Sequence, residues 1–381
     1  MTTETIFTNA KLVLEDRVLH GTLVVRDGKI AAIDETRSNA PGAIDFDGDY
    51  LLPGLVELHT DHLERHLIPR PGVRWPARSG VMAHDAQIAA AGITTVFDAL
   101  AVGDIDKSSM RADVLDEMIE GVAAARDAGA LRADHWIHLR CEVSDPRMPG
   151  AVEKHLDHPL FRFASLMDHT PGQRQFLSIE AASRYYRGKY GMSEDAYHEF
   201  VERRLEEHKT HSAPNRARMV LSCRQRQIPL ASHDDATEAH IAEAVSDGVV
   251  VAEFPTTVEA ARAAHEAGLK VLGGAPNVVR GGSHSGNVAI RELAQRGWLD
   301  VLSSDYVPVS LLQAAFALTK GDGAITLPAA MRLVTAEPAR AASMHDRGRL
   351  ETGLQADLVR VRDAGDAPIV RTVWRAGARV I

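Results

Sequence analysis

The stretch AHDAQIAAAGITTVFDAL, residues 83–100, joins an alanine-rich helical run to a β-branched, strand-like run across Gly92. The same plan recurs in VEAARAAHEAGLKVLGGAPN, residues 258–277, where Gly268 separates the two runs. A glycine just after a helix tolerates the left-handed conformation that ends it. A strand that follows within a few residues is typical of alternating α/β folds. The two stretches therefore predict a repeated helix–strand unit.

Eight apolar segments of strand length follow this plan along the middle of the chain. They lie at residues 52–58, 93–99, 135–142, 163–168, 228–232, 249–254, 270–274 and 300–304. Eight strands that alternate with helices favour a closed (β/α)8 TIM-like barrel over an open sheet. A doubly wound open sheet usually carries a glycine-rich phosphate loop after its first strand. Here the first strand ends in His59-Thr60-Asp61 instead, and we predict a barrel over residues 52–340.

The two ends of the chain have a different texture. Residues 1–51 and 341–381 contain short runs that alternate apolar and polar positions, with glycines at turns such as Asp27-Gly28. Such alternation is typical of half-buried strands, and Asp-Gly is typical of hairpin turns. We predict that both ends together form one small β-sandwich domain. Residues 183–226 are strongly charged, and we expect a solvated helical excursion or a subunit contact there.

Composition limits the classes of function. The 381 residues carry a formal net charge of -9, so no global basic field attracts nucleic acid. Cys141 and Cys223 are far apart, which argues against a disulfide framework and favours the reducing cytoplasm. We find no apolar run that approaches the roughly 18–20 residues of a membrane span and no signal-peptide pattern. We expect neither a nucleic-acid nor a membrane partner, and a homo-oligomer is compatible with these features.

Histidines and carboxylates follow five of the eight predicted strands. They are His59 and Asp61 after the first strand, Glu142 after the third, Asp168 and His169 after the fourth, His233, Asp234 and Asp235 after the fifth, and Asp305 after the eighth. Catalytic groups of such barrels sit at these strand ends. Imidazole and carboxylate are ligands of Zn²⁺ or Mn²⁺. We predict two divalent ions held by His59, Asp61, Glu142, His169, His233 and Asp305.

Several of these positions have alternatives. Cys141 could replace Glu142 as a ligand, and strand alternation sends their side chains to opposite faces. Asp168 could take the place of its neighbour His169 as a metal ligand. An aspartate at a strand end often caps the following helix, which is the structural alternative for Asp305.

The pattern as a whole resembles the amidohydrolase superfamily. That family places an H-x-H pair after its first strand, a bridging Lys or Glu, two later histidines, and an Asp after the eighth strand. LLPGLVELHTD at 51–61 and RGRLETGLQADLVRV at 347–361 resemble its entry into the barrel and its return to the β-sandwich. The resemblance implies a metal-dependent hydrolase in which Glu142 bridges two metals. Asp61 replaces the second histidine of the pair, and our strand count puts the bridge and histidines on strands three, four and five instead of four, five and six.

Longer segments, from ELHTDHLERH at 57–66 to LSSDYVPVSLLQAAF at 302–316, resemble a narrower family of diphosphatases from bacterial phosphonate breakdown. This resemblance implies hydrolysis of a methylphosphonate-bearing ribose 5-triphosphate to the 5-phosphate and pyrophosphate. Such an anionic substrate needs local positive charge. Arginine binds phosphate bidentately, and glycines let backbone N–H groups approach an anion. The candidate substrate-binding residues are Arg174, Lys189, Asn277, Arg280 and His284.

The mechanism that follows is metal-assisted hydrolysis. The metals would lower the pKa of a bound water, and Asp305 would accept its proton as general base. The basic residues would neutralise charge on the transferring and leaving groups, and Mg²⁺ can accompany the triphosphate. One alternative is a C–N hydrolase or deaminase that acts on a cyclic amide or a nucleobase; the basic loops favour phosphate over it. Another is a non-catalytic binding protein, which an incomplete ligand set would favour, whereas this set is complete.

Overall fold

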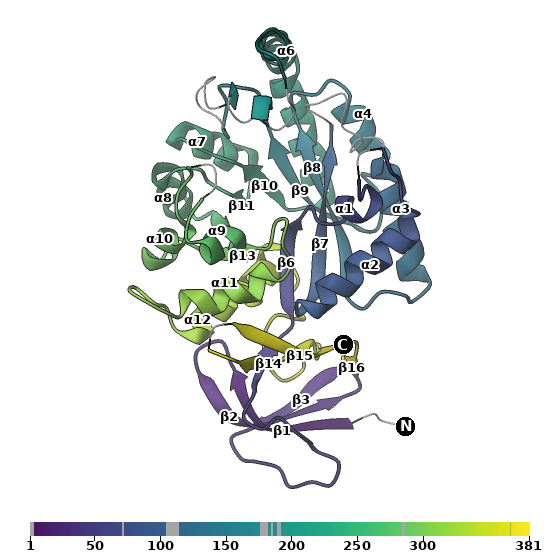
Figure 1. Ribbon diagram of the computed structural model, residues 1–381, viewed down its shortest axis with the longest axis vertical. Coiled ribbons are helices and arrows are strands. Elements are labelled where there is room, and N and C mark those ends of the chain that lie inside the picture. Colours follow the sequence, from purple (N-terminus) through teal and green to yellow (C-terminus); the bar gives the residue numbers. More distant parts are fainter. Residues whose placement is uncertain are drawn as a thin grey trace.

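The computed structural model describes residues 4–70, 72–103, 114–175, 182–183, 186–188, 192–283, 286–365 and 367–381. Figure 1 shows two connected parts, a barrel surrounded by helices and a smaller sheet that carries both ends of the chain.

Eight parallel strands form the barrel in the order in which they occur along the chain. They are β6 (Leu55–Thr60), β7 (Ile93–Val102), β8 (Asp134–Glu142), β9 (Phe161–Met167), β10 (Leu230–His233), β11 (Val251–Glu253), β12 (Lys270–Gly274) and β13 (Val301–Ser303). A parallel bridge between Thr60 and Asp305 brings the last strand back to the first. The predicted TIM-like barrel and its strand count are therefore confirmed.

Helices cover the outside of the barrel (Figure 1). The described ones are α1 (Glu64–Leu67), α2 (Ala77–Ala90), α3 (Leu115–Asp127), α4 (Met148–Glu153), α6 (Glu194–Arg226), α7 (Glu238–Asp247), α8 (Val258–Glu266), α9 (Ala275–Arg280), α10 (Ile290–Gln295), α11 (Ser310–Leu318), α12 (Leu327–Arg332) and α13 (Ala336–Ala341). Gly92 follows α2 with φ +88°, as the sequence predicts for a residue that ends a helix. None of the described helices combines the length and apolar character needed to cross a bilayer.

Side chains of the barrel strands alternate between two apolar layers. Phe97 and Phe163 fill the barrel interior, whereas Val96, Leu139 and Cys141 belong to the cluster that contacts the outer helices. Because successive side chains of a strand point to opposite faces, this alternation fixes which polar residues reach the barrel mouth. Each fully buried aliphatic or aromatic side chain contributes roughly 1.5–3 kcal/mol of transfer free energy to this arrangement.

The strands from both ends of the chain form one mixed sheet, with the order β16-β15-β14-β5-β1-β2-β3 and β4 paired to β1. The strands are β1 (Glu4–Val13), β2 (Val18–Arg26), β3 (Lys29–Asp34), β4 (Ile44–Asp45), β5 (Tyr50–Pro53), β14 (Leu358–Asp363), β15 (Pro368–Arg375) and β16 (Ala378–Arg379). β5 and β14 join the two ends, with Leu358 opposite Pro53. Phe7 and Trp374 pack edge to face with ring centroids 4.8 Å apart. The prediction that both termini build one β unit is therefore confirmed.

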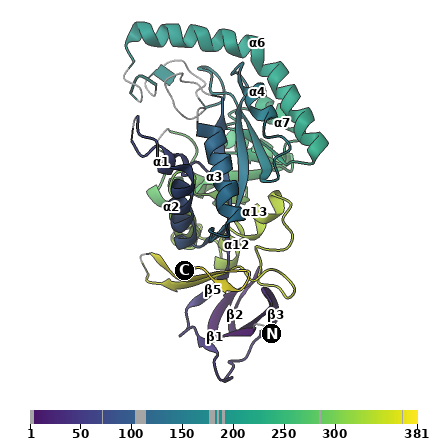
Figure 2. The ribbon, with the colours of Figure 1, turned by 90° about the vertical axis from the view of Figure 1, so that its right-hand side faces the viewer.

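The long helix α6 crosses the top of the barrel and bends down its side (Figure 2). Tyr197, Phe200 and Met219 on this helix are buried. Arg204 and Asn215 are also buried, and both reach residues that follow barrel strand β8. The segment is helical, as expected, but the expectation that this excursion is solvated is wrong for one face of α6, which packs onto the barrel. A subunit contact through its other face stays a prediction.

Candidate metal centre

The carboxyl ends of the barrel strands bring three predicted histidines together. The rings of His59 on β6 and His233 on β10 stack with centroids 5.5 Å apart, and His169, two residues beyond β9, lies 5.7 Å from the His233 ring. His169 and His233 each offer a nitrogen, and Asp234 an oxygen, that lie within 4.8 Å of one another. This is a group of donors that could hold a divalent ion.

Glutamates orient these histidines. The Nδ1 atoms of His59 and His233 each lie 3.1 Å from a carboxylate oxygen of Glu253, at the end of β11. Glu142 plays the same part for His169, with 2.7 Å between His169 Nδ1 and Glu142 Oε2. A carboxylate that accepts the Nδ1 proton leaves the lone pair on Nε2, and this arrangement is usual for histidines that bind metals. We assign Glu253 this orienting role because both of its oxygens accept from imidazoles.

Three aspartates complete the mouth. Asp61 Oδ1 and Asp234 Oδ2 are buried and have no hydrogen-bond partner among the residues that the structure describes. The guanidinium of Arg140 lies 4.0 Å from Asp61 Oδ2. A buried carboxylate oxygen that accepts no hydrogen bond is costly, so these two atoms are suited to bind a cation. The chemistry of the donors, imidazole with carboxylate, fits a borderline divalent metal.

The mouth also perturbs its acids and bases. Burial, together with the nearby carboxylate of Asp61, raises the pKa of Asp305 to about 7. Burial raises the pKa of Asp234 to about 6 and lowers that of His233 to about 3. His233 is therefore neutral, which is the form of histidine that binds metals.

Asp234 and Asp305 have φ angles of 56° and 54°. This left-handed backbone is unfavourable for residues with a side chain and is concentrated at functional sites.

The alternative between Cys141 and Glu142 is decided by the pleat of β8. Cys141 packs in the outer apolar layer, and its thiol lies 3.6 Å from the carbonyl oxygen of Leu139. Glu142 faces the mouth, where Arg204 Nη2 donates to its Oε1 at 3.0 Å. Ser144 also donates to Oε1, at 2.5 Å. Both oxygens of Glu142 are thus engaged by protein groups.

Asp168 turns away from His169 and binds α6 instead. Its Oδ2 lies 2.6 Å from His208 Nδ1 and accepts a hydrogen bond of 2.8 Å from Ser212 Oγ. Asp168 therefore anchors the long helix, and His169 is the neighbour that reaches the other histidines.

The predicted phosphate-binding residues have differing surroundings. Arg174 is buried and ion-paired with Asp235 and Glu243. The side-chain amide of Asn277 donates to Val288 O, just before α10, and accepts from Ile290 N, at the start of that helix, at 3.0 Å each. Arg280 is exposed at the end of α9. Lys189 and His284 lie outside the described residues.

Sequence reasoning missed His138, Arg140 and Glu253. His138 and Arg140 lie on β8 four and two residues before Glu142, so strand alternation alone would have put all three on the same face. Glu253 ends the sixth strand, and a carboxylate at that place was a signal of the same kind as the others.

Comparison with known proteins identifies the family to which the chain belongs. A model described as the amidohydrolase family matches residues 196–381. The chain is 48% identical over 376 residues to the alpha-D-ribose 1-methylphosphonate 5-triphosphate diphosphatase of Escherichia coli (strain K12), covering 98% of this chain and 100% of the relative. The chain belongs to the amidohydrolase family.

Solved structures of other amidohydrolase-like proteins share the fold. A crystal structure of amidohydrolase eaj56179 is 18% identical, with a TM-score of 0.64 and coverage of 100% of this chain and 99% of that one. The N-acetyl-D-glucosamine-6-phosphate deacetylase of Mycobacterium smegmatis is 16% identical, with a TM-score of 0.62 and coverage of 99% and 100%. The 5-methylcytosine deaminase of Klebsiella pneumoniae is 15% identical, with a TM-score of 0.65 and coverage of 99% and 98%. At such identities the likeness concerns the fold alone.

Proposed function

We propose that this amidohydrolase cleaves α-D-ribose 1-methylphosphonate 5-triphosphate to the 5-phosphate and pyrophosphate, in the breakdown of phosphonates. The observation that carries the proposal is the 48% identity to the Escherichia coli diphosphatase over 100% of that protein. The polar mouth of the barrel, with its histidines and partly accessible Asp305, supports it as a place for hydrolysis.

The donors of the mouth fit two divalent cations, Zn²⁺ or Mn²⁺. His169, His233 and Asp234 would hold one, and His59, Asp61 and Asp305 would hold the other. The support is the unpartnered buried oxygens of Asp61 and Asp234. When bound, such cations lower the pKa of water and neutralise phosphate charge. In this proposal Glu142 and Glu253 orient the histidines, which replaces the earlier expectation of Glu142 as a bridge.

Asp305 is the proposed general base. Its carboxylate would lie beside the cations and their bound water, where it can accept a proton from that water and release it again. In the metal-free protein, burial and Asp61 raise the pKa of Asp305 to about 7. The water oxygen forms a bond to the α-phosphorus while the anhydride bond to the β-phosphate breaks, so that pyrophosphate leaves with the electron pair.

Arg280 is exposed and suited to neutralise charge on the leaving group, and Lys189 and His284 are proposed to share this task. Mg²⁺ can accompany the triphosphate. The proposed role of Arg174 is to fix Asp235 beside the mouth, because its guanidinium is already paired.

One assay tests this function. Metal-loaded protein is incubated with the methylphosphonate-bearing ribose 5-triphosphate, and pyrophosphate and orthophosphate are measured separately. We expect equal amounts of pyrophosphate and 5-phosphate. Release of orthophosphate alone, or no turnover by protein with full metal content, would refute the proposal. Ammonia release from nucleobases, measured in parallel, tests the C–N hydrolase alternative, which uses the same ligands and which the 48% identity to the diphosphatase makes the less favoured reading.

The proposal includes a cytoplasmic location. Cys141 and Cys223 are both buried free thiols, as expected in a reducing compartment. Cell fractionation that finds the protein outside the cytoplasm would contradict this part alone.

A further inference from the structure

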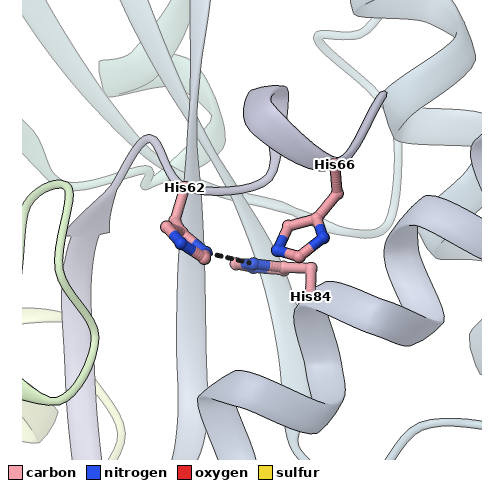
Figure 3. A group of neighbouring side chains, drawn as sticks. All are labelled: His62, His66 and His84. Carbon is pink, nitrogen blue, oxygen red and sulfur yellow. Dashed lines mark hydrogen bonds between the residues drawn. The ribbon is translucent and has the colours of Figure 1, made fainter. Parts of the chain in front are cut away.

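A second group of histidines lies outside the barrel mouth. His62 is in the turn after β6, His66 is in α1, and His84 is in α2. Figure 3 shows the three rings converging between the turn and the two helices. Their centroids are 5.0 Å apart for His62 and His66, 5.6 Å for His62 and His84, and 5.7 Å for His66 and His84. Nothing in the proposed hydrolysis uses these residues.

The nitrogen atoms have the spacing of metal ligands. His62 Nδ1 and His84 Nδ1 are 3.4 Å apart. Two nitrogens on a tetrahedral zinc ion, each at about 2.0–2.1 Å from the metal, lie about 3.3–3.4 Å from one another. One ligand nitrogen from each of the three histidines lies within 4.8 Å of the others.

His66 supplies an independent observation. Its Nε2 is buried and has no hydrogen-bond partner in the described part of the chain. In Figure 3 one ring nitrogen of His66 is turned toward the two other rings. A hydrogen bond between His62 and His84 alone would leave this buried nitrogen unexplained, whereas a shared ion would use it.

Asp98 prepares His84 for such a role. His84 Nε2 lies 2.7 Å from Asp98 Oδ1, and both side chains are fully buried. The carboxylate accepts the Nε2 proton and so leaves the lone pair on Nδ1, the atom that faces His62. The other oxygen of Asp98 is 2.8 Å from His135 Nδ1 on β8, which keeps the carboxylate in place.

We propose that His62, His66 and His84 bind one zinc ion, in a site separate from the barrel mouth, with water as the fourth ligand. The ligands come from a turn and two helices, and the orienting carboxylate comes from a side chain on the outer face of β7. Three histidines with an outer carboxylate are typical of zinc. The ion would tie the turn that carries Asp61 to α2, and its role is to hold that turn in position.

The test counts zinc. Full-length wild type, His66→Gln and the control His265→Gln, an exposed histidine on α8, are stripped with a chelator and reloaded in zinc-buffered solution. We expect His66→Gln to hold one zinc fewer than the wild type and His265→Gln to hold the same number. Equal zinc in all three, with His66→Gln folded by circular dichroism, would overturn the proposal and leave an imidazole hydrogen bond as the explanation.

Two further measurements separate this site from the mouth. The double variant that carries both His66→Gln and His233→Gln, a change in the mouth, should hold one zinc fewer than the single variant His233→Gln. Zinc should also raise the Tm of the wild type more than that of His66→Gln. If His66→Gln does not fold, His62→Gln takes its place in the same comparison, and a zinc content unchanged from the wild type again overturns the proposal.

Discussion

Aspartates in the barrel mouth and in the layer behind it are satisfied in opposite ways. At the mouth, Asp61 and Asp234 each keep a buried oxygen that accepts no hydrogen bond from the described residues. Behind it, the two oxygens of Asp98 each meet an imidazole, from His84 and His135. The protein therefore pairs both oxygens of the outer carboxylate itself. At the mouth, Arg140 lies 4.0 Å from Asp61 Oδ2 but leaves part of the negative charge uncompensated, in keeping with the proposed cations.

The pKa values of Asp305 and Asp98 show the same contrast between the mouth and the layer behind it. Burial and Asp61 raise the pKa of Asp305 to about 7. Burial also acts to raise the pKa of Asp98, but His135 and His84 outweigh it and hold that pKa below its ordinary value. A carboxylate that is stable only with a cation marks a functional site, and one that is stable with its protein partners marks a structural one. The same change, Asp to Asn, should therefore have different consequences at the two places.

The largest expected effect is on catalysis by Asp305→Asn. The amide keeps the shape of the side chain but cannot accept a proton. We expect kcat to fall by at least about 10²–10⁴-fold, as for a lost general base, while most of the metal stays bound. Turnover and elemental analysis on the same sample measure both. Normal kcat with full metal and lowered stability would instead make Asp305 a helix cap.

Next comes Asp98→Asn, which should damage stability. Removing one partner of a buried ion pair typically costs about 3–5 kcal/mol. Asp98→Asn takes from the buried His135 the closer of its two carboxylates, at 2.8 Å, and leaves Asp85 at 3.4 Å. Urea denaturation at pH 7 measures the loss. Asp157→Asn is the matched control, since Asp157 is exposed and pairs with Arg226 on the surface; we expect a change below about 1 kcal/mol there. Equal effects of the two substitutions would contradict the contrast.

A smaller effect of opposite sign is expected for Asp305→Asn in protein stripped of metal. Because the folded pKa of Asp305 is about 7, above the ordinary value near 3.9, protonation stabilises the fold. This contribution is full below about pH 4 and is lost as the pH rises to about 7. At pH 8 in chelator the variant should be more stable than the wild type by more than about 1 kcal/mol. A less stable variant under these conditions would show that the mouth does not strain its carboxylates.

The smallest effect on activity concerns the two arginines. Arg280→Ala should raise KM about tenfold, the loss of one charge-assisted contact, and leave stability within about 0.5 kcal/mol. Arg174→Ala should do the reverse, lowering stability because the buried Asp235 loses its ion pair. Steady-state kinetics and denaturation of both variants give the comparison. A raised KM for Arg174→Ala with unchanged stability would restore Arg174 as a phosphate ligand.

Local sequence patterns were enough to predict the barrel. The eight strands were predicted from apolar runs and from glycines such as Gly92. The positive φ of Gly92 is a local property of the chain where a helix ends, so it needs no information about distant residues. Strand alternation further predicts that the side chains of Cys141 and Glu142 point to opposite faces of the strand, but it does not predict which of them faces the mouth. The packing of Cys141 among outer apolar residues supplies that answer.

Contacts between distant parts of the chain were not predictable in this way. Glu253 reaches His59 across 194 residues, and only the closure of the barrel brings them together. Arg174 meets Asp235 across 61 residues, so a basic residue that looks free in the sequence is neutralised in the fold. The sequence around His84 predicts only an ordinary helix, because its partners His62 and His66 belong to an earlier turn and helix.

The pairing of β5 with β14 has a consequence for the order in which the molecule is made. Strands β1 to β5 leave the ribosome before the barrel does, but the strand opposite Leu51 and Leu52 begins only at Leu358. The entire barrel is synthesised while the edge of β5 stays unpaired. An open edge of this kind readily joins another chain. The nascent protein is therefore most exposed to aggregation after the hairpins of β1 to β3 have formed and before β14 has emerged.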